Sequence, residues 1–382
     1  MADYLALAAM SLVLVYTFWQ LNNFRKWQET GKLVEDRTGG PWPFLTLIIP
    51  FRNEREHLPD LLKDLRAQDY PTDRWEAIFI DDFSTDGGAS FLEERTDEHI
   101  HLLHLVDAPD ALTTIAHKKS AITLAISRSR GQVMVTTDAD CRWPSDGLTR
   151  IAGEFRSGKE VVLGPVLIDP VRDICEGYQA LDLMAYQFLT RASMRGGAPI
   201  LANGAHFAFR KELFLRVGGY AGVDHLPSGD DVLLLHKFAL ERPRYGYVPG
   251  TPVMTRPVRG WRNLWRQRLR WAGKAGNYTE PRLKWAQALS YLTSLSLVVG
   301  TLGTLWHPRS LAIVLIAWIL KALVDGFCLD HIARHYGQRD RMRWYPTTAL
   351  IYPIFLVAVG TAALLGLRAD WKGRKADGLP GN

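Results

Sequence analysis

The stretch that decides the fold runs from residue 45 to residue 81 and reads LTLIIPFRNEREHLPDLLKDLRAQDYPTDRWEAIFID. Its apolar ends, residues 45–50 and residues 75–81, predict two buried strands. Between them, residues 54–68 predict a helix that has four leucines on one face, namely Leu58, Leu61, Leu62 and Leu65. Strand, helix and strand in this order predict a βαβ unit in a parallel sheet, whose ligands bind beyond the carboxyl ends of the strands.

Polar side chains follow both predicted strands. Residues 50–54 read PFRNE after the first strand, and residues 81–87 read DDFSTDG after the second. Carboxylates in these loops can accept hydrogen bonds from a nucleoside base or from ribose hydroxyls. Residues 81–87 are equally typical of a turn that caps the next helix.

A pair of aspartates follows a third predicted strand. Lys118 and Lys119 open a predicted helix that ends near residue 128, and the strand at residues 132–137 leads into Asp138-Ala139-Asp140. Two carboxylates so close together are costly unless a cation compensates them, and hard oxygen ligands suit Mg²⁺ or Mn²⁺. A solvated loop is the alternative interpretation.

Two later loops carry further polar or small residues. Residues 203–205 read Asn-Gly-Ala, where the glycine permits close approach of a sugar, although a turn explains it better on local grounds. Asp230 and Asp231 precede a predicted helix at residues 232–240, and a carboxylate there can act as a general base. Helix capping is the alternative, although a cap explains one aspartate more easily than two.

Residues 258–271 read VRGWRNLWRQRLRW and predict a helix rich in Trp and Arg. Gln267, Arg270 and Trp271 fall on one face of it. That face presents an amide, a planar donor for phosphate oxygens and a large ring. An amphipathic helix lying at a membrane surface is the alternative interpretation.

Four apolar segments predict transmembrane helices: residues 4–21, 286–306, 310–329 and 345–367. The third contains Lys321 and Asp325, a pair that either marks a pathway or neutralises itself. The first lacks a basic leading region and a small-residue cleavage site, so we expect an uncleaved anchor.

Basic residues after the first apolar segment predict its orientation. Arg25, Lys26 and Lys32 place the N-terminus outside and residues 22–285 in the cytoplasm. Four spans then place the C-terminal tail outside as well. This conflicts with the rule that basic residues favour the cytoplasmic side, because the tail contains Arg368, Lys372, Arg374 and Lys375.

Composition limits the class of protein. The chain has 382 residues, of which 47% are hydrophobic and 23% charged, and this excludes disorder. The net charge of +6 lies largely beside the apolar segments, which favours a membrane surface and a diphosphate over nucleic acid as partner. Cys141, Cys175 and Cys328 lack metal-type spacing and are expected to be reduced thiols.

Five motifs in order resemble those of membrane-bound family-two glycosyltransferases, including ceramide glucosyltransferases and short chitin-oligosaccharide or polysaccharide synthases. They are Pro-x-x-Asn-Glu, Asp-Asp-x-Ser-x-Asp, Asp-x-Asp, Gly-Asp-Asp and Gln-x-x-Arg-Trp, and the resemblance covers residues 45–275. It implies an α/β glycosyltransferase-A fold with a mixed, mainly parallel sheet, plus about four transmembrane helices. Residues 173–195, which are apolar and aromatic, either rest on the membrane or form a core helix.

The resemblance also implies a division of the chain. The expected parts are a transmembrane anchor (1–22), a cytoplasmic glycosyltransferase domain (45–257), an amphipathic interface helix (258–280), three transmembrane helices (286–367) and a polar tail (368–382).

The resemblance assigns roles residue by residue. Asp231 is the implied general base and Asp140 the implied ligand of Mg²⁺ or Mn²⁺. The implied nucleotide-sugar set is Phe51, Glu54, Asp82, Lys118, Asp138, Ala139, Gln267 and Arg270, and the implied acceptor set is Gly204, Asp230 and Trp271. Two positions depart from the family pattern, because His117 replaces a glycine and Asp230 replaces a glutamate.

The function expected from these features is inverting transfer of a hexose or N-acetylhexosamine. The donor is a nucleotide sugar, expected to be UDP-linked, and the acceptor is a membrane lipid or a short lipid-associated glycan. We expect an integral protein of a bacterial inner membrane with a cytoplasmic catalytic domain and no nucleic-acid partner.

Three other functions stay open from the sequence. A processive polysaccharide synthase is one, although four helices are few for a polymer channel. Lys321 and Asp325 motivate a transporter or lipid-binding protein with a nucleotide-sensing domain. A nucleotidyltransferase is disfavoured because the first strand lacks a Gly-rich phosphate loop.

Overall fold

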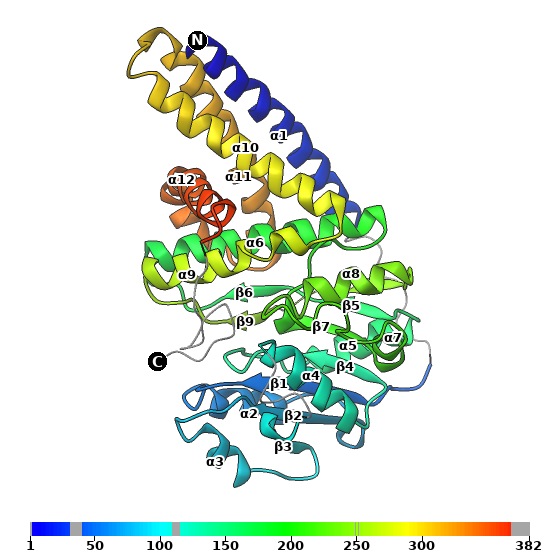
Figure 1. Cartoon of the computed structure of the whole chain (residues 1–382). Coiled ribbons are helices and arrows are strands. Elements are labelled where there is room, and N and C mark those ends of the chain that lie inside the picture. Colours follow the sequence, from blue (N-terminus) through cyan, green and yellow to red (C-terminus); the bar gives the residue numbers. More distant parts are fainter. Residues whose placement is uncertain (1, 31–39, 109–114, 249, 251, 368–382) are drawn as a thin grey trace. The chain divides into compact units, whose positions relative to one another are not determined.

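The computed structural model describes residues 2–30, 40–108, 115–248, 250 and 252–367 (Figure 1). The described chain separates into two compact units. The sheet unit lies within residues 40–169 and 196–256, and the helical unit lies within residues 2–30, 170–195 and 257–367.

A seven-stranded sheet forms the centre of the sheet unit, in the order β3-β2-β1-β4-β7-β5-β8. Its strands are β1 (Leu45–Phe51), β2 (Trp75–Asp81), β3 (Ile100–His104), β4 (Val133–Thr136), β5 (Val161–Leu163), β7 (Phe207–Arg210) and β8 (Tyr245–Tyr247). Strand β7 runs antiparallel to β4 and β5, and the other pairs are parallel. The predicted mixed, mainly parallel sheet is therefore confirmed. A small parallel sheet joins β6 (Val166–Ile168) to β9 (Val253–Thr255).

The helices of this unit are α2 (Leu58–Arg66), α3 (Gly88–Glu93), α4 (His117–Arg128), α5 (Gly147–Arg156), α7 (Lys211–Arg216) and α8 (Val232–Leu240). The helix predicted at residues 54–68 is shorter than expected. Residues before α2 form a turn in which the backbone N–H of His57 donates to the carbonyl of Glu54. The four leucines of α2 are buried, as their spacing predicts.

Aromatic packing fixes α8 against the sheet. Phe207 and Phe209 of β7 are at most 1% exposed, and their rings lie 6.1 and 5.2 Å from that of Phe238 in α8. Burial of one such side chain stabilises the fold by about 1.5–3 kcal/mol. The first turn of α8, which follows Asp231, is thereby held at a defined place beside β7.

Six helices form the helical unit: α1 (Ala2–Thr30), α6 (Ile174–Ser193), α9 (Trp261–Ala272), α10 (Pro281–Gly303), α11 (Leu311–His335) and α12 (Tyr345–Leu364). Four described segments are long and apolar enough to cross a membrane: Tyr4–Thr30, Pro281–Gly303, Pro308–His335 and Arg339–Leu364. They coincide with the four predicted segments, although α10 begins earlier than residue 286. Lys32 and the tail at residues 368–382, on which part of the orientation argument depends, lie outside the described residues.

The long helices pack through small and aliphatic side chains. Val13 of α1, Leu297 of α10 and Ala317 of α11 form a fully buried cluster. Where the third apolar segment is charged, Lys321 Nζ lies 2.6 Å from Asp325 Oδ2. The pair neutralises itself, which is one of the two interpretations that the sequence leaves open.

Helix α6 belongs to the helical unit, which contains residues 170–195. Most of its residues are buried, and Cys175 and Tyr178 cluster with Leu264 of α9 and with Phe355 of α12. Within the helical unit, α6 is thus a core helix. All three cysteines are free thiols, as expected.

Candidate active site

Hydrogen bonds join the loops that follow β1 and β2. The Asn53 side chain accepts from the N–H of Thr85 at 2.8 Å, and Ser84 Oγ accepts from the N–H of Asn53 at 3.0 Å. Each loop holds one non-glycine residue in the left-handed region, Asn53 with φ of 54° and Phe83 with φ of 55°. Such conformations are costly and persist where the surroundings impose them, so both loops have a fixed shape.

The three aspartates of the second loop, which follows β2, make different contacts. Asp81 accepts from the N–H of Ser84, and Asp86 accepts from the N–H of Gly88, so these two build the turn. Asp82 instead is 5% exposed, with its Oδ1 3.2 Å from Nδ1 of His117. The turn interpretation therefore holds for Asp81 and Asp86.

Backbone and side-chain contacts describe the three predicted nucleoside residues, Phe51, Glu54 and Asp82. The N–H of Asp82 donates to the carbonyl of Phe51 at 2.8 Å, which places these two side by side. The carboxylate of Glu54 lies 3.7 Å from His57 Nε2, within its own turn.

Lys118 joins two motifs that are far apart in the sequence. Its Nζ lies 2.7 Å from Asp138 Oδ1 and 3.0 Å from Asp230 Oδ2. Removal from water alone would lower the pKa of Lys118, but Asp138, Asp230 and Asp231 outweigh this and hold the pKa well above its ordinary value. The side chain is therefore a fixed ammonium among carboxylates.

Asp231 is held by two backbone donors. Its Oδ1 accepts from the N–H of Val232 at 2.7 Å and caps α8, while its Oδ2 accepts from the N–H of Gly204 at 3.1 Å. The predicted cap is thus present, and the same carboxylate also fixes the loop at residues 203–205. These bonds restrict the Asp231 side chain to one orientation.

The predicted acceptor residues Gly204 and Asp230 lie next to Asp231. A Cβ at position 204 would stand 3.1 Å from Asp230 Oδ2 and 3.4 Å from Lys118 Nζ. Glycine is favoured here by this close approach and not by its backbone conformation, because its φ is not positive. The hydroxyl of Tyr220 donates to the Asp230 carbonyl at 3.0 Å and supports the same loop.

The Asp138-Ala139-Asp140 segment follows β4 directly. Ala139 is 3% exposed, and Asp140 Oδ2 accepts from the Thr255 hydroxyl at 3.4 Å. Burial, and then the charges of Asp140 and Asp138, raise the pKa of the Cys141 thiol well above its usual range. The Cys141 thiol donates to Asp140 Oδ1 at 3.9 Å.

An ion-pair network anchors the end of this segment. Arg142 donates to both carboxylate oxygens of Asp64 in α2, at 2.6 and 2.8 Å, and the N–H of Trp143 donates to the same carboxylate. A bidentate pair of this kind fixes geometry as well as adding stability.

The donor set fits a divalent ion with few protein ligands. Among the described residues, no group of three or more His, Cys, Asp or Glu is arranged to hold a metal. Asp138 is engaged by Lys118, which leaves the hard oxygens of Asp140 as the candidate ligands. An ion such as Mg²⁺ that keeps waters and binds substrate phosphates needs no more than one or two carboxylates.

The remaining predicted residues lie on α9, in the helical unit. Arg268 donates to Gln267 Oε1 at 2.9 Å, its guanidinium lies 4.1 Å from the Trp271 ring, and it pairs with Asp182 at 2.7 Å. Gln267 and Trp271 are therefore positioned by Arg268. Helix α9 contains the predicted face of Gln267, Arg270 and Trp271, with Arg270 half-buried.

Sequence reasoning missed Arg268, Thr255 and Tyr220. Arg268 lies inside the Gln-x-x-Arg-Trp motif. In the sequence, its positive charge was the feature that could have drawn attention to it, but its buried partner Asp182 lies on another helix. Thr255 is 115 residues from Asp140, so no local pattern connects them.

Comparison with known proteins identifies the family. Residues 133–359 match the sequence model of glycosyl transferase family group 2, and residues 46–217 match that of glycosyl transferase family 2. Beta-monoglucosyldiacylglycerol synthase of Synechocystis sp. is 24% identical over 349 residues, which are 81% of this chain and 71% of that protein. Undecaprenyl-phosphate 4-deoxy-4-formamido-L-arabinose transferase of Pseudomonas savastanoi pv. phaseolicola is 29% identical over 125 residues, 32% of this chain and 36% of that protein.

The chain spans 40%, 57% and 49% of the length of three more curated proteins. A solved mannosyltransferase, PcManGT from Pyrobaculum calidifontis in complex with GDP-Man and Mn²⁺, superposes with a TM-score of 0.56 at 21% identity. The superposition covers 96% of this chain and 99% of the other, and it confirms the predicted glycosyltransferase-A fold. Because one family model covers more than half of the chain, this protein belongs to the family-two glycosyltransferases.

Proposed function

We propose that this glycosyltransferase transfers one hexose or N-acetylhexosamine, with inversion, from a UDP-linked sugar to a membrane lipid or a short lipid-associated glycan. The observation that carries the proposal is the cluster around Lys118. One ammonium there joins Asp138 of the Asp-x-Asp segment to Asp230, which adjoins Asp231. Asp138, on the side proposed for the donor diphosphate, and Asp230, on the side proposed for the acceptor, are thus both contacted by Lys118.

Asp231 is the proposed general base. Inverting transfer needs a carboxylate that takes the proton of the acceptor hydroxyl as the bond to the leaving nucleotide breaks. Each carboxylate oxygen has two lone pairs, and the N–H groups of Gly204 and Val232 occupy one on each. The other lone pairs are directed by those bonds, so Asp231 is oriented before the acceptor arrives.

The donor side follows from the loops after β1, β2 and β4. Phe51, Glu54 and Asp82 are proposed to contact the nucleoside, and Lys118 and the Asp138-Ala139 backbone to face the diphosphate. Mg²⁺ or Mn²⁺ held by Asp140 would offset the negative charge of that diphosphate. Gln267 and Arg270 of α9 are proposed to bind the diphosphate as well, and Trp271 the acceptor.

A lipid acceptor is supported by two kinds of observation. Relatives are named for a glucosyldiacylglycerol and for an undecaprenyl phosphate. The four candidate spans give this chain a route to the membrane, and Arg25 and Lys26 favour a cytoplasmic catalytic domain at a bacterial inner membrane. The transporter interpretation rested on the charges of Lys321 and Asp325. Because these two residues pair with each other, their charges no longer favour a transport pathway.

The test is a transfer assay with the full chain in lipid nanodiscs. UDP-glucose, UDP-galactose, UDP-N-acetylglucosamine and GDP-mannose are each supplied with Mg²⁺ or Mn²⁺ and with neutral or phosphorylated lipids, and products are sized by mass spectrometry. We expect one sugar per lipid from a UDP-linked donor, and loss of transfer in EDTA. Long polymers would establish a processive synthase, transfer from GDP-mannose alone would overturn the UDP assignment, and full activity in EDTA would remove the metal.

A further inference from the structure

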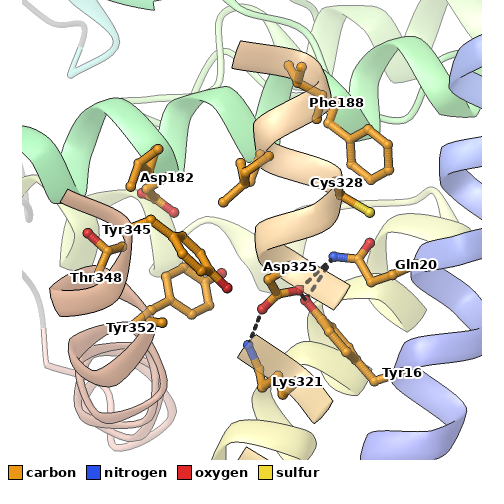
Figure 2. A pocket seen from close by; sticks show the side chains of 15 residues that line it. Tyr16, Gln20, Asp182, Phe188, Lys321, Asp325, Cys328, Tyr345, Thr348 and Tyr352 are labelled. Carbon is orange, nitrogen blue, oxygen red and sulfur yellow. Dashed lines mark hydrogen bonds and ion pairs between the residues drawn. The ribbon is translucent and has the colours of Figure 1, made fainter. Parts of the chain in front are cut away.

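A pocket with a cavity volume of about 60 Å³ lies inside the helical unit (Figure 2). Its walls come from α1, α6, α11 and α12, and it contains both polar and apolar side chains. No role assigned above involves this pocket.

Three candidate spans, in α1, α11 and α12, line the pocket together with α6, which is not a candidate span. Gln20 lies at the end of the apolar segment 4–21 within α1, and Thr348 lies in the first turn of α12. Asp182 and Phe188 come from α6, which is outside the candidate spans. The ends of transmembrane helices lie at the depth of lipid headgroups.

The charges of the pocket are neutralised within the protein. Lys321 is paired with Asp325 at 2.6 Å, and the other oxygen of Asp325 accepts from the Tyr16 hydroxyl at 2.8 Å and from Gln20 Nε2 at 3.2 Å. Asp182 is paired with Arg268 at 2.7 Å. A charged ligand would therefore have to break an existing ion pair to find a counter-ion, whereas a neutral ligand would not.

Two buried polar atoms are not satisfied by the protein. Gln20 Oε1 and Thr348 Oγ1 make no hydrogen bond within the described part of the chain, and their residues are 9% and 5% exposed. Both residues line the pocket. A buried polar atom without a partner is costly, so these atoms favour a ligand that brings hydroxyl groups.

Part of the pocket wall is apolar. Leu181, Phe188, Leu329 and Ile332 contribute to it. A ligand that combines hydroxyls with hydrocarbon matches this mixed lining.

We propose that this pocket binds the headgroup of an uncharged, hydroxyl-bearing lipid. The Thr348 hydroxyl and the Gln20 carbonyl oxygen form hydrogen bonds with the lipid hydroxyls, and the apolar wall contacts the adjoining hydrocarbon. The assignment of this lipid as the sugar acceptor rests on the proposed function, whereas its binding rests on the pocket alone.

The test uses the full chain in nanodiscs and a diacylglycerol that carries a photoactivatable diazirine near its headgroup. Cross-linked peptides are identified by mass spectrometry. Thr348→Val removes the hydroxyl at nearly constant volume, and Thr347→Val is the matched control, because Thr347 adjoins it on α12 but does not line the pocket.

We expect cross-links to α6, α11 and α12, and competition by dioleoylglycerol but not by a polyprenyl phosphate. Thr348→Val should weaken competition by roughly five-fold, the effect of one neutral hydrogen bond, and Thr347→Val should not. Equal competition by the polyprenyl phosphate would overturn the preference for an uncharged lipid. Cross-links confined to other surfaces, or equal behaviour of the two variants, would overturn the site.

The two proposals fail in different ways. If the diazirine lipid labels this pocket but dioleoylglycerol receives no sugar from any nucleotide sugar, the acceptor role fails and the binding site stands. If transfer occurs while labelling is elsewhere and Thr348→Val behaves like Thr347→Val, the function stands and the pocket proposal fails.

Discussion

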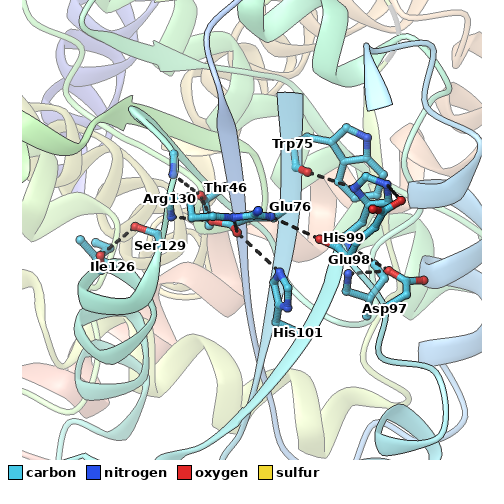
Figure 3. Close-up of polar contacts among 12 residues, drawn as sticks. Thr46, Trp75, Glu76, Asp97, Glu98, His99, His101, Ile126, Ser129 and Arg130 are labelled. Atoms are coloured by element: carbon cyan, nitrogen blue, oxygen red, sulfur yellow. Dashed lines mark hydrogen bonds and ion pairs between the residues drawn. The ribbon is translucent and has the colours of Figure 1, made fainter. Parts of the chain in front are cut away.

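Strands β1, β2 and β4 carry one polar cluster near their amino ends and a different one beyond their carboxyl ends. Near the amino ends, Glu76 is 2% exposed and accepts from the Thr46 hydroxyl and from the N–H and Nε of Arg130, each at 2.7 Å (Figure 3). Beyond the carboxyl ends, Lys118 lies between Asp138 and Asp230.

The two clusters differ in how charge is matched. Burial alone would raise the pKa of Glu76, but the hydrogen bonds from Arg130 and Thr46, together with the Arg130 charge, hold the pKa below its ordinary value. There the permanent charge of Arg130 serves one carboxylate, and His101 Nε2 lies 3.6 Å from the same carboxylate. Around Lys118 a single ammonium interacts with three carboxylates, those of Asp138, Asp230 and Asp231. The Glu76 carboxylate has its counter-charge within the protein, which suits a structural role. The excess of negative charge around Lys118 suits a site that binds further groups.

The largest effect is expected from Asp140→Asn. A neutral amide is a poorer ligand for a hard divalent ion, so sugar transfer should fall to background while the fold is retained. Transfer rates at fixed Mn²⁺ and thermal unfolding in detergent would be measured together. Asp73→Asn, which alters a side chain 76% exposed in the same unit, is the control and should keep its activity. Near-normal transfer by Asp140→Asn would show that this carboxylate holds no metal.

A smaller loss is expected from Asp231→Asn. Removal of a general base should lower kcat by roughly 100-fold, while the affinity for the nucleotide stays similar because the base acts after binding. Steady-state kinetics and calorimetry with UDP separate the two quantities. Asp224→Asn is a control on a side chain 68% exposed. Loss of UDP binding by Asp231→Asn would move Asp231 to the donor side.

The sequence predicts the elements of this molecule better than the contacts between them. Helix α8 has the predicted bounds, because an acidic N-terminus and an apolar run define it locally. The start of α2 was predicted too early, because the periodicity of its leucines cannot show that residues 54–57 form a turn. The four long helices follow from hydropathy alone.

Within the candidate site, the motifs were visible in the sequence but their connections were not. No pattern predicts that Lys118 contacts Asp138 and Asp230, or that Gly204 donates to Asp231, because these residues lie on different elements. Arg268 was passed over for a related reason. Its burial depends on Asp182, 86 positions earlier on α6, and sequence periodicity reports only on the helix that contains it.

An intermediate effect is expected from Arg270→Lys, which tests whether α9 adds charge to the donor site. Lysine keeps the charge and stays compatible with a membrane surface, but it lacks the planar bidentate donor. If Arg270 binds the diphosphate, transfer should fall about 10-fold, the equivalent of one charge-assisted hydrogen bond. Arg266→Lys, at an exposed position of α9, is the matched control. Equal activity of both variants would reduce α9 to an anchor.

The smallest effect on catalysis is expected at the other end of the strands, from Glu76→Gln. The amide loses the charge-assisted bonds to Arg130, and because the Arg130 side chain is 57% exposed, we expect a cost of only about 2 kcal/mol. Transfer per folded molecule should stay unchanged, since Glu76 belongs to the amino-end cluster. Glu98→Gln, at a side chain 85% exposed, is the control.

The dependence on pH sharpens this last test. The pKa of Glu76 is lower in the folded chain than in the unfolded one, so its ionisation stabilises the fold above the unfolded value of about 4.5, and this stabilisation is lost as the pH falls through the folded value. Unfolding temperatures of wild type and Glu76→Gln in detergent should differ by a few degrees at pH 7, and the difference should shrink as the pH falls below about 4.5 through the folded pKa of Glu76. A difference that is constant with pH would mean that Gln disturbs packing rather than charge. A fall in kcat at pH 7 would mean that the amino-end cluster is coupled to the site, and the contrast between the two ends would then be wrong.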